Sequence, residues 1–265
     1  MIATRKARSV KSVTSLGADE LERYARHIVL PEIGGPGQQK LKAAKVTVIG
    51  AGGLGSPVLQ YLAAAGLGSL TIIDDDRVSL SNLQRQIIHD TALIGEKKGQ
   101  SARRRIHAIN PHVQVLIVEQ RLNAANARAL LTGADVVVDG SDSFETRFTV
   151  AETCEALEIP LVTGAVGRFD GSLTVLEPWL CDKSGRQNPR YRDVFPDKPP
   201  AGLIPGCAEA GLVGALTGVI GTLQAMEVIK LVTGIGDPLV GRLLLYDALS
   251  VRFEMIRYAR SADTT

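Results

Sequence analysis

A glycine-rich loop between two short apolar runs constrains this chain more than any other feature. The first run, residues 46–49, is β-branched and leads directly into the loop. The loop holds Gly50, Gly52, Gly53 and Gly55. Glycines at this spacing let the backbone turn tightly and bring its N–H groups close to a polyphosphate. The helix expected over residues 56–65 directs the positive end of its dipole at the same anion, so the pattern predicts nucleotide binding.

The second run and the polar residues after it indicate which nucleotide chemistry the loop serves. A strand over residues 70–73 ends at Asp74, whose carboxylate can accept hydrogen bonds from ribose hydroxyls. A dehydrogenase needs a hydride-accepting site, whereas an adenylating enzyme needs cations on the triphosphate and a magnesium ligand. The chain supplies residues suited to the second task at Asp74–Asp76, Asn82, Gln84, Arg85 and Lys97–Lys98. Spacing alone also allows Arg85 and the two lysines to belong to a solvated face.

Strand and helix patterns alternate along the chain and predict an α/β fold. The unbroken apolar run at 135–139 is typical of a buried parallel strand, and Asp142 follows its end, where doubly wound sheets bind ligands. We expect a Rossmann-like, doubly wound, mostly parallel sheet with an antiparallel C-terminal continuation. Strands are expected at 46–49, 70–73, 114–118, 135–139, 161–163 and 169–176, and a final strand starts at 242–246 and ends with the segment 251–258. Helices are expected at 56–65, 98–109, 124–131, 147–157 and 211–232.

Length, charge and cysteine content limit the class of protein. A chain of 265 residues with 45% hydrophobic content can bury one full core. The net charge of +2 argues against nucleic-acid and membrane partners, and we expect no membrane span because no apolar run approaches roughly 18 residues. Three irregularly spaced cysteines fit a reducing cytoplasm. We expect a disordered tail over 1–18 and one domain over 19–260, whose charged, Pro-rich loop at about 178–206 is mobile.

Motifs spread over residues 20–258 resemble the MoeB/ThiF/HesA family, the bacterial relatives of ubiquitin-activating enzymes, and within it the MoeB branch. The motifs include Arg23–Arg26, Gly50–Ser56, Ser81–Gln86, Gly95–Lys98, Asp139–Asp142 and Cys207–Gly211. The resemblance implies ATP- and Mg²⁺-dependent adenylation of the C-terminal Gly-Gly carboxylate of a small ubiquitin-like sulfur carrier. The expected carrier is the small subunit of molybdopterin synthase, with the carrier of the thiamine pathway as the alternative. A separate sulfurtransferase would supply the sulfur.

The resemblance also assigns roles to individual residues. It places Arg85 and Lys98 on the phosphates, Asp142 on magnesium or near the reacting carboxylate, and Asp74 on the ribose. Asn82 and Gln86 would add polar contacts near the phosphates. Arg26 would reach the triphosphate from the second subunit of a homodimer, although spacing alone favours a surface helix residue. Glycines 211, 214, 218 and 221 indicate a helix that packs closely against another backbone.

The cysteines depart from the family pattern. Cys207 stands where some members carry a cysteine that links to the carrier, and its alternative is a small residue packed beneath the loop. Many members bind a structural zinc with two Cys-x-x-Cys pairs. Here Arg190 and Asp193 occupy the first pair and the C-terminal pair is missing, so we expect no structural zinc and a contact between Arg190 and Asp193.

Three other functions stay open on the sequence. An NAD-dependent oxidoreductase shares the glycine loop. A non-catalytic carrier-binding protein shares the fold, but it would be free to lose Arg26, Arg85, Lys98 and Asp142, all of which are present. A tRNA-modifying dehydratase of the same superfamily is less consistent with the near-neutral charge and with the motif that begins at Cys207.

Overall fold

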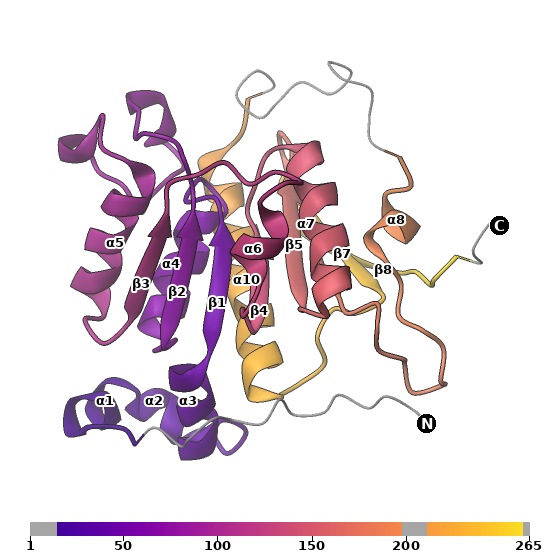
Figure 1. Cartoon of the computed structure of the whole chain (residues 1–265), viewed down its shortest axis with the longest axis horizontal. Helices are drawn as coiled ribbons and strands as arrows, with labels where there is room; N and C mark the ends of the chain where they lie inside the picture. Colours follow the sequence, from indigo (N-terminus) through magenta and orange to yellow (C-terminus); the bar gives the residue numbers. More distant parts are fainter. Residues whose placement is uncertain (1–14, 198–210, 262–265) are drawn as a thin grey trace.

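The computed structural model describes residues 15–197 and 211–261, which contain one eight-stranded sheet. The strand order is β3-β2-β1-β4-β5-β6-β7-β8 (Figure 1). The first five of these strands are parallel, and the last three run antiparallel to their neighbours. The strands are β1 (Lys45–Ile49), β2 (Ser69–Ile73), β3 (Gln114–Val118), β4 (Val136–Asp139), β5 (Leu161–Val166), β6 (Asp170–Leu176), β7 (Arg242–Asp247) and β8 (Arg252–Arg257). The predicted fold class is confirmed.

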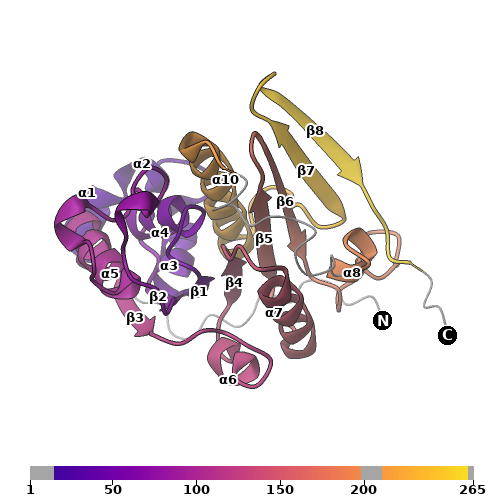
Figure 2. The ribbon, with the colours of Figure 1, turned by 90° about the horizontal axis from the view of Figure 1, so that it is seen from above.

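Helices cover both faces of the parallel part of the sheet. Residues Val46 and Val48 pack on one face, in the core cluster that also includes residues of α4, α5 and α10. Ile49 and Val137 pack on the opposite face, in the cluster of α6 and α7. Because both faces are covered, these strands are predominantly apolar. The covering helices are α4 (Gly55–Ala64), α5 (Lys98–Ile109) and α10 (Gly214–Thr233) on one face, and α6 (Ala127–Leu131) and α7 (Phe144–Leu157) on the other (Figures 1 and 2).

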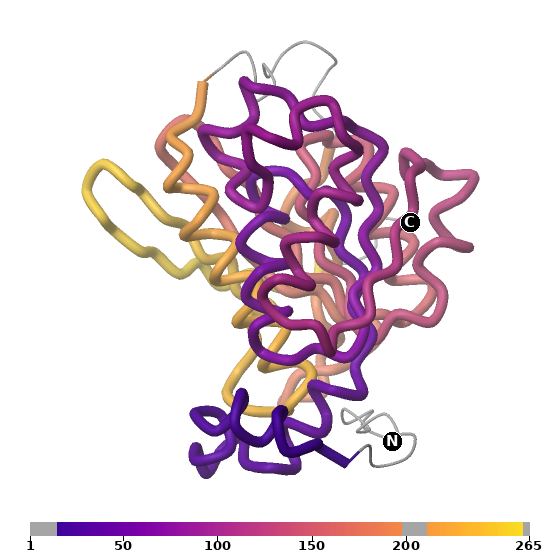
Figure 3. The backbone as a smooth tube through the Cα atoms, turned by 90° about the vertical axis from the view of Figure 1, so that its left-hand side faces the viewer, coloured from indigo at the N-terminus to yellow at the C-terminus, as the bar shows by residue number. Residues whose placement is uncertain are grey.

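The last two strands form a hairpin that extends beyond the helical layers. Figures 2 and 3 show β7 and β8 projecting from one side of the molecule. Every residue of β8 is exposed and every residue of β7 is half-buried. Tyr246 and Phe253 stack across the hairpin with ring centroids 4.5 Å apart.

Three N-terminal helices lie beneath the amino ends of the parallel strands, away from the loops that follow those strands (Figures 1 and 3). They are α1 (Ala18–Arg23), α2 (Ala25–Ile28) and α3 (Gly34–Ala43). Gln38 of α3 is fully buried and its Nε2 donates to the carbonyl of Ala65 at 2.8 Å. Lys42 pairs with the buried Glu20 at 2.6 Å, so α1 is held against α3.

Helix α10 corrects one expectation and confirms part of another. It is long and apolar enough to cross a membrane by length and composition, contrary to the expectation that no run approaches that length. Its contacts with β4, β5, β6 and α4 identify it as a core helix. The close approach predicted for its glycines occurs within the chain: a Cβ on Gly221 would lie 2.5 Å from Pro57 Cγ, and one on Gly214 would lie 2.2 Å from the carbonyl oxygen of Gln84. Gly218 faces open space.

Residues 178–197 of the Pro-rich loop carry more structure than their composition predicts. They include the helix α8 (Tyr191–Val194), and Tyr191 is buried against Phe148. The predicted contact between Arg190 and Asp193 is present: the backbone N–H of Arg190 donates to Asp193 Oδ2 at 2.6 Å. The other carboxylate oxygen accepts from the N–H of Ser261 at 3.1 Å, which ties the loop to the C-terminal segment. Mobility of the loop stays a prediction.

The starts of three predicted helices were wrong by three residues. Helix α7 begins at Phe144, not 147, because Ser143 caps it with its hydroxyl on the N–H of Thr146. Helix α6 begins at Ala127, not 124, because the Asn123 side chain accepts from two following N–H groups and forms a turn there. Helix α10 begins at Gly214, after the extended Val213.

Candidate functional site

The glycine loop connects β1 to α4, and its backbone needs glycine at two positions. Gly50 has φ of +86°, a conformation that side chains rarely adopt. A Cβ on Gly55 would lie 1.9 Å from the carbonyl oxygen of Gly50, so only glycine lets the helix start this close to the strand end. The amino end of α4 is thereby held beside the loop, where its free N–H groups favour an anion.

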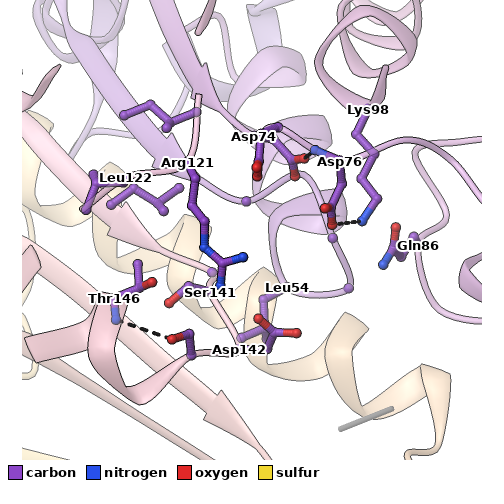
Figure 4. A pocket seen from close by; sticks show the side chains of 18 of the residues that line it. Leu54, Asp74, Asp76, Gln86, Lys98, Arg121, Leu122, Ser141, Asp142 and Thr146 are labelled. Atoms are coloured by element: carbon purple, nitrogen blue, oxygen red, sulfur yellow. Dashed lines mark hydrogen bonds and ion pairs between the residues drawn. The ribbon is translucent and has the colours of Figure 1, made fainter. Parts of the chain in front are cut away.

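A pocket opens at the carboxyl ends of the parallel strands, where the strand order reverses between β1 and β4 (Figure 4). This is the position at which doubly wound sheets bind nucleotides. The pocket brings together most residues that the sequence predicts for the site: Gly50, Gly52, Gly53, Asp74, Asp76, Arg85, Gln86, Lys98 and Asp142.

One wall of the pocket is a linked set of acidic and basic groups. Asp74 Oδ2 accepts from the N–H of Ala51 at 2.7 Å, and its Oδ1 accepts from the N–H of Asp76 at 2.9 Å. Burial raises the pKa of Asp74 above its ordinary value, although these two hydrogen bonds and the charge of Lys98 oppose the shift. The buried Lys98 donates to Asp76 Oδ2 at 2.8 Å, and the Asp76 side chain is 65% exposed (Figure 4).

The opposite wall is the loop after β4, which holds Asp142. The fully buried Asp139 accepts at Oδ1 from the Ser141 N–H at 3.0 Å and from the Ser141 hydroxyl at 2.7 Å. Its Oδ2 accepts from the hydroxyl of Thr163 at 3.0 Å. Arg147 Nη2 donates to the carbonyl of Ser141 at 2.9 Å. Ser141 is therefore held at three atoms, and the neighbouring Asp142 is exposed on a fixed loop facing the pocket.

Three of the predicted residues that the structure describes do not line this pocket, and a fourth predicted residue is not described. Gly55 lies behind the loop, and Asn82 uses its carbonyl to accept from the N–H groups of Arg85 and Gln86 at 3.1 and 3.0 Å. Arg26 belongs to α2, at the amino end of the sheet and far from the pocket of its own chain (Figure 1). Cys207 lies outside the described residues.

Two arginines line the pocket that the sequence analysis did not select. Arg121 follows the end of β3, and Figure 4 shows its side chain extending toward Ser141. Its position after a parallel strand was a usable signal, because ligands bind outside the carboxyl ends of such strands. Arg147 lies on the first turn of α7, and no pattern in the sequence distinguishes it from a surface helix residue. Its Nε is buried without a hydrogen-bond partner among the described residues.

The fold and pocket define a nucleotide-binding α/β protein with cations and a carboxylate directed at the phosphate region. Comparison with known proteins makes the class specific. The chain belongs to the ThiF family, whose model matches residues 24–265.

The relatives and the solved structures agree with this assignment. The chain is 47% identical to the sulfur carrier protein adenylyltransferase of Thermus thermophilus, over 92% of this chain and 89% of that protein. It is 44% identical to the SAMP-activating enzyme E1 of Haloferax volcanii, over 94% and 89% respectively. Against the probable adenylyltransferase/sulfurtransferase MoeZ of Mycobacterium tuberculosis the identity is 44%, over 96% of this chain and 64% of that protein. The protein is an adenylyltransferase of the E1/ThiF type. The crystal structure of Escherichia coli MccB shares the fold, with a TM-score of 0.78 at 22% identity over 93% of this chain and 72% of that one.

Proposed function

We propose that this protein uses ATP to adenylate the C-terminal Gly-Gly carboxylate of a small ubiquitin-like sulfur carrier and releases pyrophosphate. The observation that carries the proposal is the meeting of the glycine loop, Arg85, Lys98 and Asp142 in one pocket. The names of the two relatives that this chain covers along most of their length support a carrier protein as the substrate.

The reaction explains why cations are needed at this place. A carboxylate attacks the α-phosphorus of ATP while pyrophosphate leaves, so two anions approach each other. Arg85 and Lys98 would screen this charge, and a preorganised cation of this kind contributes about 10²–10³ in rate. The Lys98 ammonium is paired with Asp76, whose exposed side chain can move aside when phosphate arrives. Lys98 therefore has its charge stabilised before ATP binds.

Asp142 is the proposed magnesium ligand. Mg²⁺ in phosphoryl-transfer sites keeps several waters and takes one or two carboxylates together with substrate phosphates. Among the exposed carboxylates that line the pocket, Asp76 is paired with Lys98, whereas Asp142 lies on the opposite wall and fits that donor set. The described part of the chain contains no group of three or more His, Cys, Asp or Glu residues that could hold a metal ion without a substrate. The ion would neutralise charge on the phosphates, and Asp142 would hold it beside the position of the carrier carboxylate.

Two further parts of the proposal concern partners. Because Arg26 lies at the opposite end of the sheet from its own pocket, it could reach a triphosphate only from a second subunit. We therefore propose a homodimer with shared sites. The expected carrier is the small subunit of molybdopterin synthase, with the thiamine-pathway carrier as the alternative, and sulfur would come from a separate sulfurtransferase.

The proposal is tested by carrier-dependent exchange of labelled pyrophosphate into ATP. We expect exchange with one member of a panel of Gly-Gly-ending carriers, and none with the same carrier lacking its last glycine. The member that gives exchange identifies the pathway. Protection against heat by NAD but not by ATP with Mg²⁺ would contradict the proposal and favour an oxidoreductase.

A further inference from the structure

His89 lies behind the glycine loop and contacts two elements that contribute to the site. It is buried, with 7% of its surface exposed. Its Nε2 lies 2.9 Å from the carbonyl oxygen of Ala51 in the glycine loop, and its Nδ1 lies 2.8 Å from the hydroxyl of Ser101 on α5. The ring does not line the pocket, so it cannot contact the nucleotide directly.

These contacts fix the protonation of the ring. A carbonyl oxygen only accepts, so Nε2 carries the proton and donates to Ala51, and Nδ1 accepts from the Ser101 hydroxyl. Burial lowers the pKa of His89, and the charge of Lys98 lowers it further, against the opposing effects of the Ala51 hydrogen bond and the charge of Asp90. The imidazole is therefore neutral and uses one nitrogen as a donor and the other as an acceptor.

The two hydrogen bonds of His89 complete a closed circuit of contacts at one end of the pocket. Ala51 donates its N–H to Asp74, Asp74 accepts from the N–H of Asp76, and Asp76 accepts from Lys98 (Figure 4). Lys98 and Ser101 stand three residues apart on α5, so they share one helical turn. His89 joins Ser101 back to Ala51. Ala51 is thus held at its N–H by Asp74 and at its carbonyl by His89.

We propose that His89 is a positioning residue that fixes the glycine loop by donating from Nε2 to the carbonyl of Ala51, with Ser101 on α5 holding the imidazole in the orientation that allows this. The inference rests on the proposed function, because it assumes that the loop and Lys98 act on the same triphosphate. Without His89, the carbonyl of Ala51 would lose its buried donor, although α5 would keep the hydrogen bonds from the side chain and the backbone N–H of Lys98 to Asp76. The loop would then bind phosphate less well.

Two substitutions separate the hydrogen bond of His89 to Ala51 from its hydrogen bond to Ser101. In His89→Gln the side-chain amide nitrogen stands near the position of Nε2 and can still donate to Ala51. In His89→Asn the amide stands near Nδ1, so the contact with Ser101 is kept and the donor to Ala51 is lost. Both variants remove the aromatic ring, so differences between them report the hydrogen bond and not the loss of packing. His107→Asn, at an exposed position on α5, is the matched control.

The first readout is the affinity for ATP with Mg²⁺, measured by calorimetry without any carrier. We expect His89→Asn to weaken binding about two- to tenfold, the range of one hydrogen bond, and His89→Gln to bind within about twofold of the wild type. Equal affinities for the two variants would overturn the inference. If His89→Asn does not fold, His89→Leu takes its place: it has no donor for Ala51 and should bind ATP about two- to tenfold more weakly than His89→Gln, and equal affinities of these two variants would overturn the inference.

The failure of this inference is distinct from failure of the proposed function. A wild-type protein that binds ATP but exchanges no pyrophosphate with any carrier would contradict the function, while the calorimetric comparison would still decide the role of His89. A wild-type protein that exchanges pyrophosphate, with two His89 variants of equal ATP affinity, would contradict only the positioning role.

Discussion

Asp139 and Asp142 stand three residues apart and serve different ends because their surroundings differ. Asp139 is fully buried and uses both oxygens on Ser141 and Thr163, so it holds the loop in place. Asp142 is exposed on that loop and faces the pocket, so its carboxylate is available to a ligand. The sequence alone places both residues at the end of one strand. Only the hydrogen bonds in the structure show that Asp139 supports the loop and that Asp142 is available to a ligand.

Arg85 and Asp142 provide the prediction at the residue scale. Arg85→Ala and Asp142→Ala should each lower carrier-dependent pyrophosphate exchange by about 10²–10³, because each removes a preorganised charge at the phosphates. Neither side chain is buried, so circular dichroism and urea unfolding should match the wild type. Arg105→Ala, at an exposed position on α5, should keep full exchange. Near wild-type exchange in a folded Arg85 or Asp142 variant would show that the role is misassigned.

At the scale of elements, the apolar patterns predicted the strands well and the helix starts less well. The parallel strands are short runs rich in Val, Ile and Leu, and a strand covered on both faces is the structure that buries such a run. Helix starts depend on a single capping or turn side chain, such as Ser143 or Asn123, and these residues also occur in loops. Arg147 could not be identified as a pocket residue from the sequence, because its contribution depends on the direction in which its side chain leaves α7.

The packing of α10 against α4 gives the next prediction. Gly221→Ala should destabilise the fold by about 1–3 kcal/mol, because its Cβ would meet Pro57 Cγ at 2.5 Å and the carbonyl of Leu54 at 2.6 Å. Gly218→Ala on the same helix meets open space and should stabilise by about 0.5–1 kcal/mol through helix propensity. Urea unfolding of both variants measures the two changes in the free energy of unfolding. Equal shifts would mean that α10 does not approach α4 this closely.

Asp193 connects the Pro-rich loop to the C-terminal segment. Burial opposes ionisation of its carboxyl, but the hydrogen bonds from Arg190 and Ser261 and the charge of Arg190 outweigh burial, so its pKa lies below the ordinary value. A depressed folded-state pKa stabilises the protein above the unfolded value of about 3.9, and this stability is lost as pH falls through the folded pKa. Asp193→Ala should therefore cost about 1–3 kcal/mol at pH 7 in urea unfolding.

The pH dependence and the metal content check the same contact. The difference in stability between the wild type and Asp193→Ala should shrink as pH falls below about 4, because the carboxyl protonates first in the unfolded state and, at lower pH, in the folded state as well. A difference independent of pH would mean that the carboxylate charge is not what holds the loop.

We also expect elemental analysis of tag-free protein to find no stoichiometric zinc. Stoichiometric zinc would contradict the idea that the contact between Arg190 and Asp193 stands in for a metal.

At the scale of the whole molecule, helix α2, which contains Arg26, lies at the end of the sheet opposite the loops that follow the parallel strands and line the pocket (Figure 1). If sites are shared between subunits, a mixture of Arg26→Ala and Asp142→Ala chains should recover part of the exchange activity. One of the two composite sites in a mixed dimer would then contain both residues. Mixed dimers shown by mass spectrometry to have formed, but without recovered activity, would refute the borrowed arginine.

The central claim is that the pocket transfers AMP to a carboxylate, and the direct test is the mass of the carrier. The carrier identified by pyrophosphate exchange is incubated with the enzyme, ATP and Mg²⁺, and its intact mass is measured. The account predicts a carrier heavier by one AMP at its C-terminal glycine, and no change for a carrier without that glycine or with Asp142→Ala enzyme. An unmodified carrier in the presence of folded, ATP-binding wild-type enzyme would contradict it.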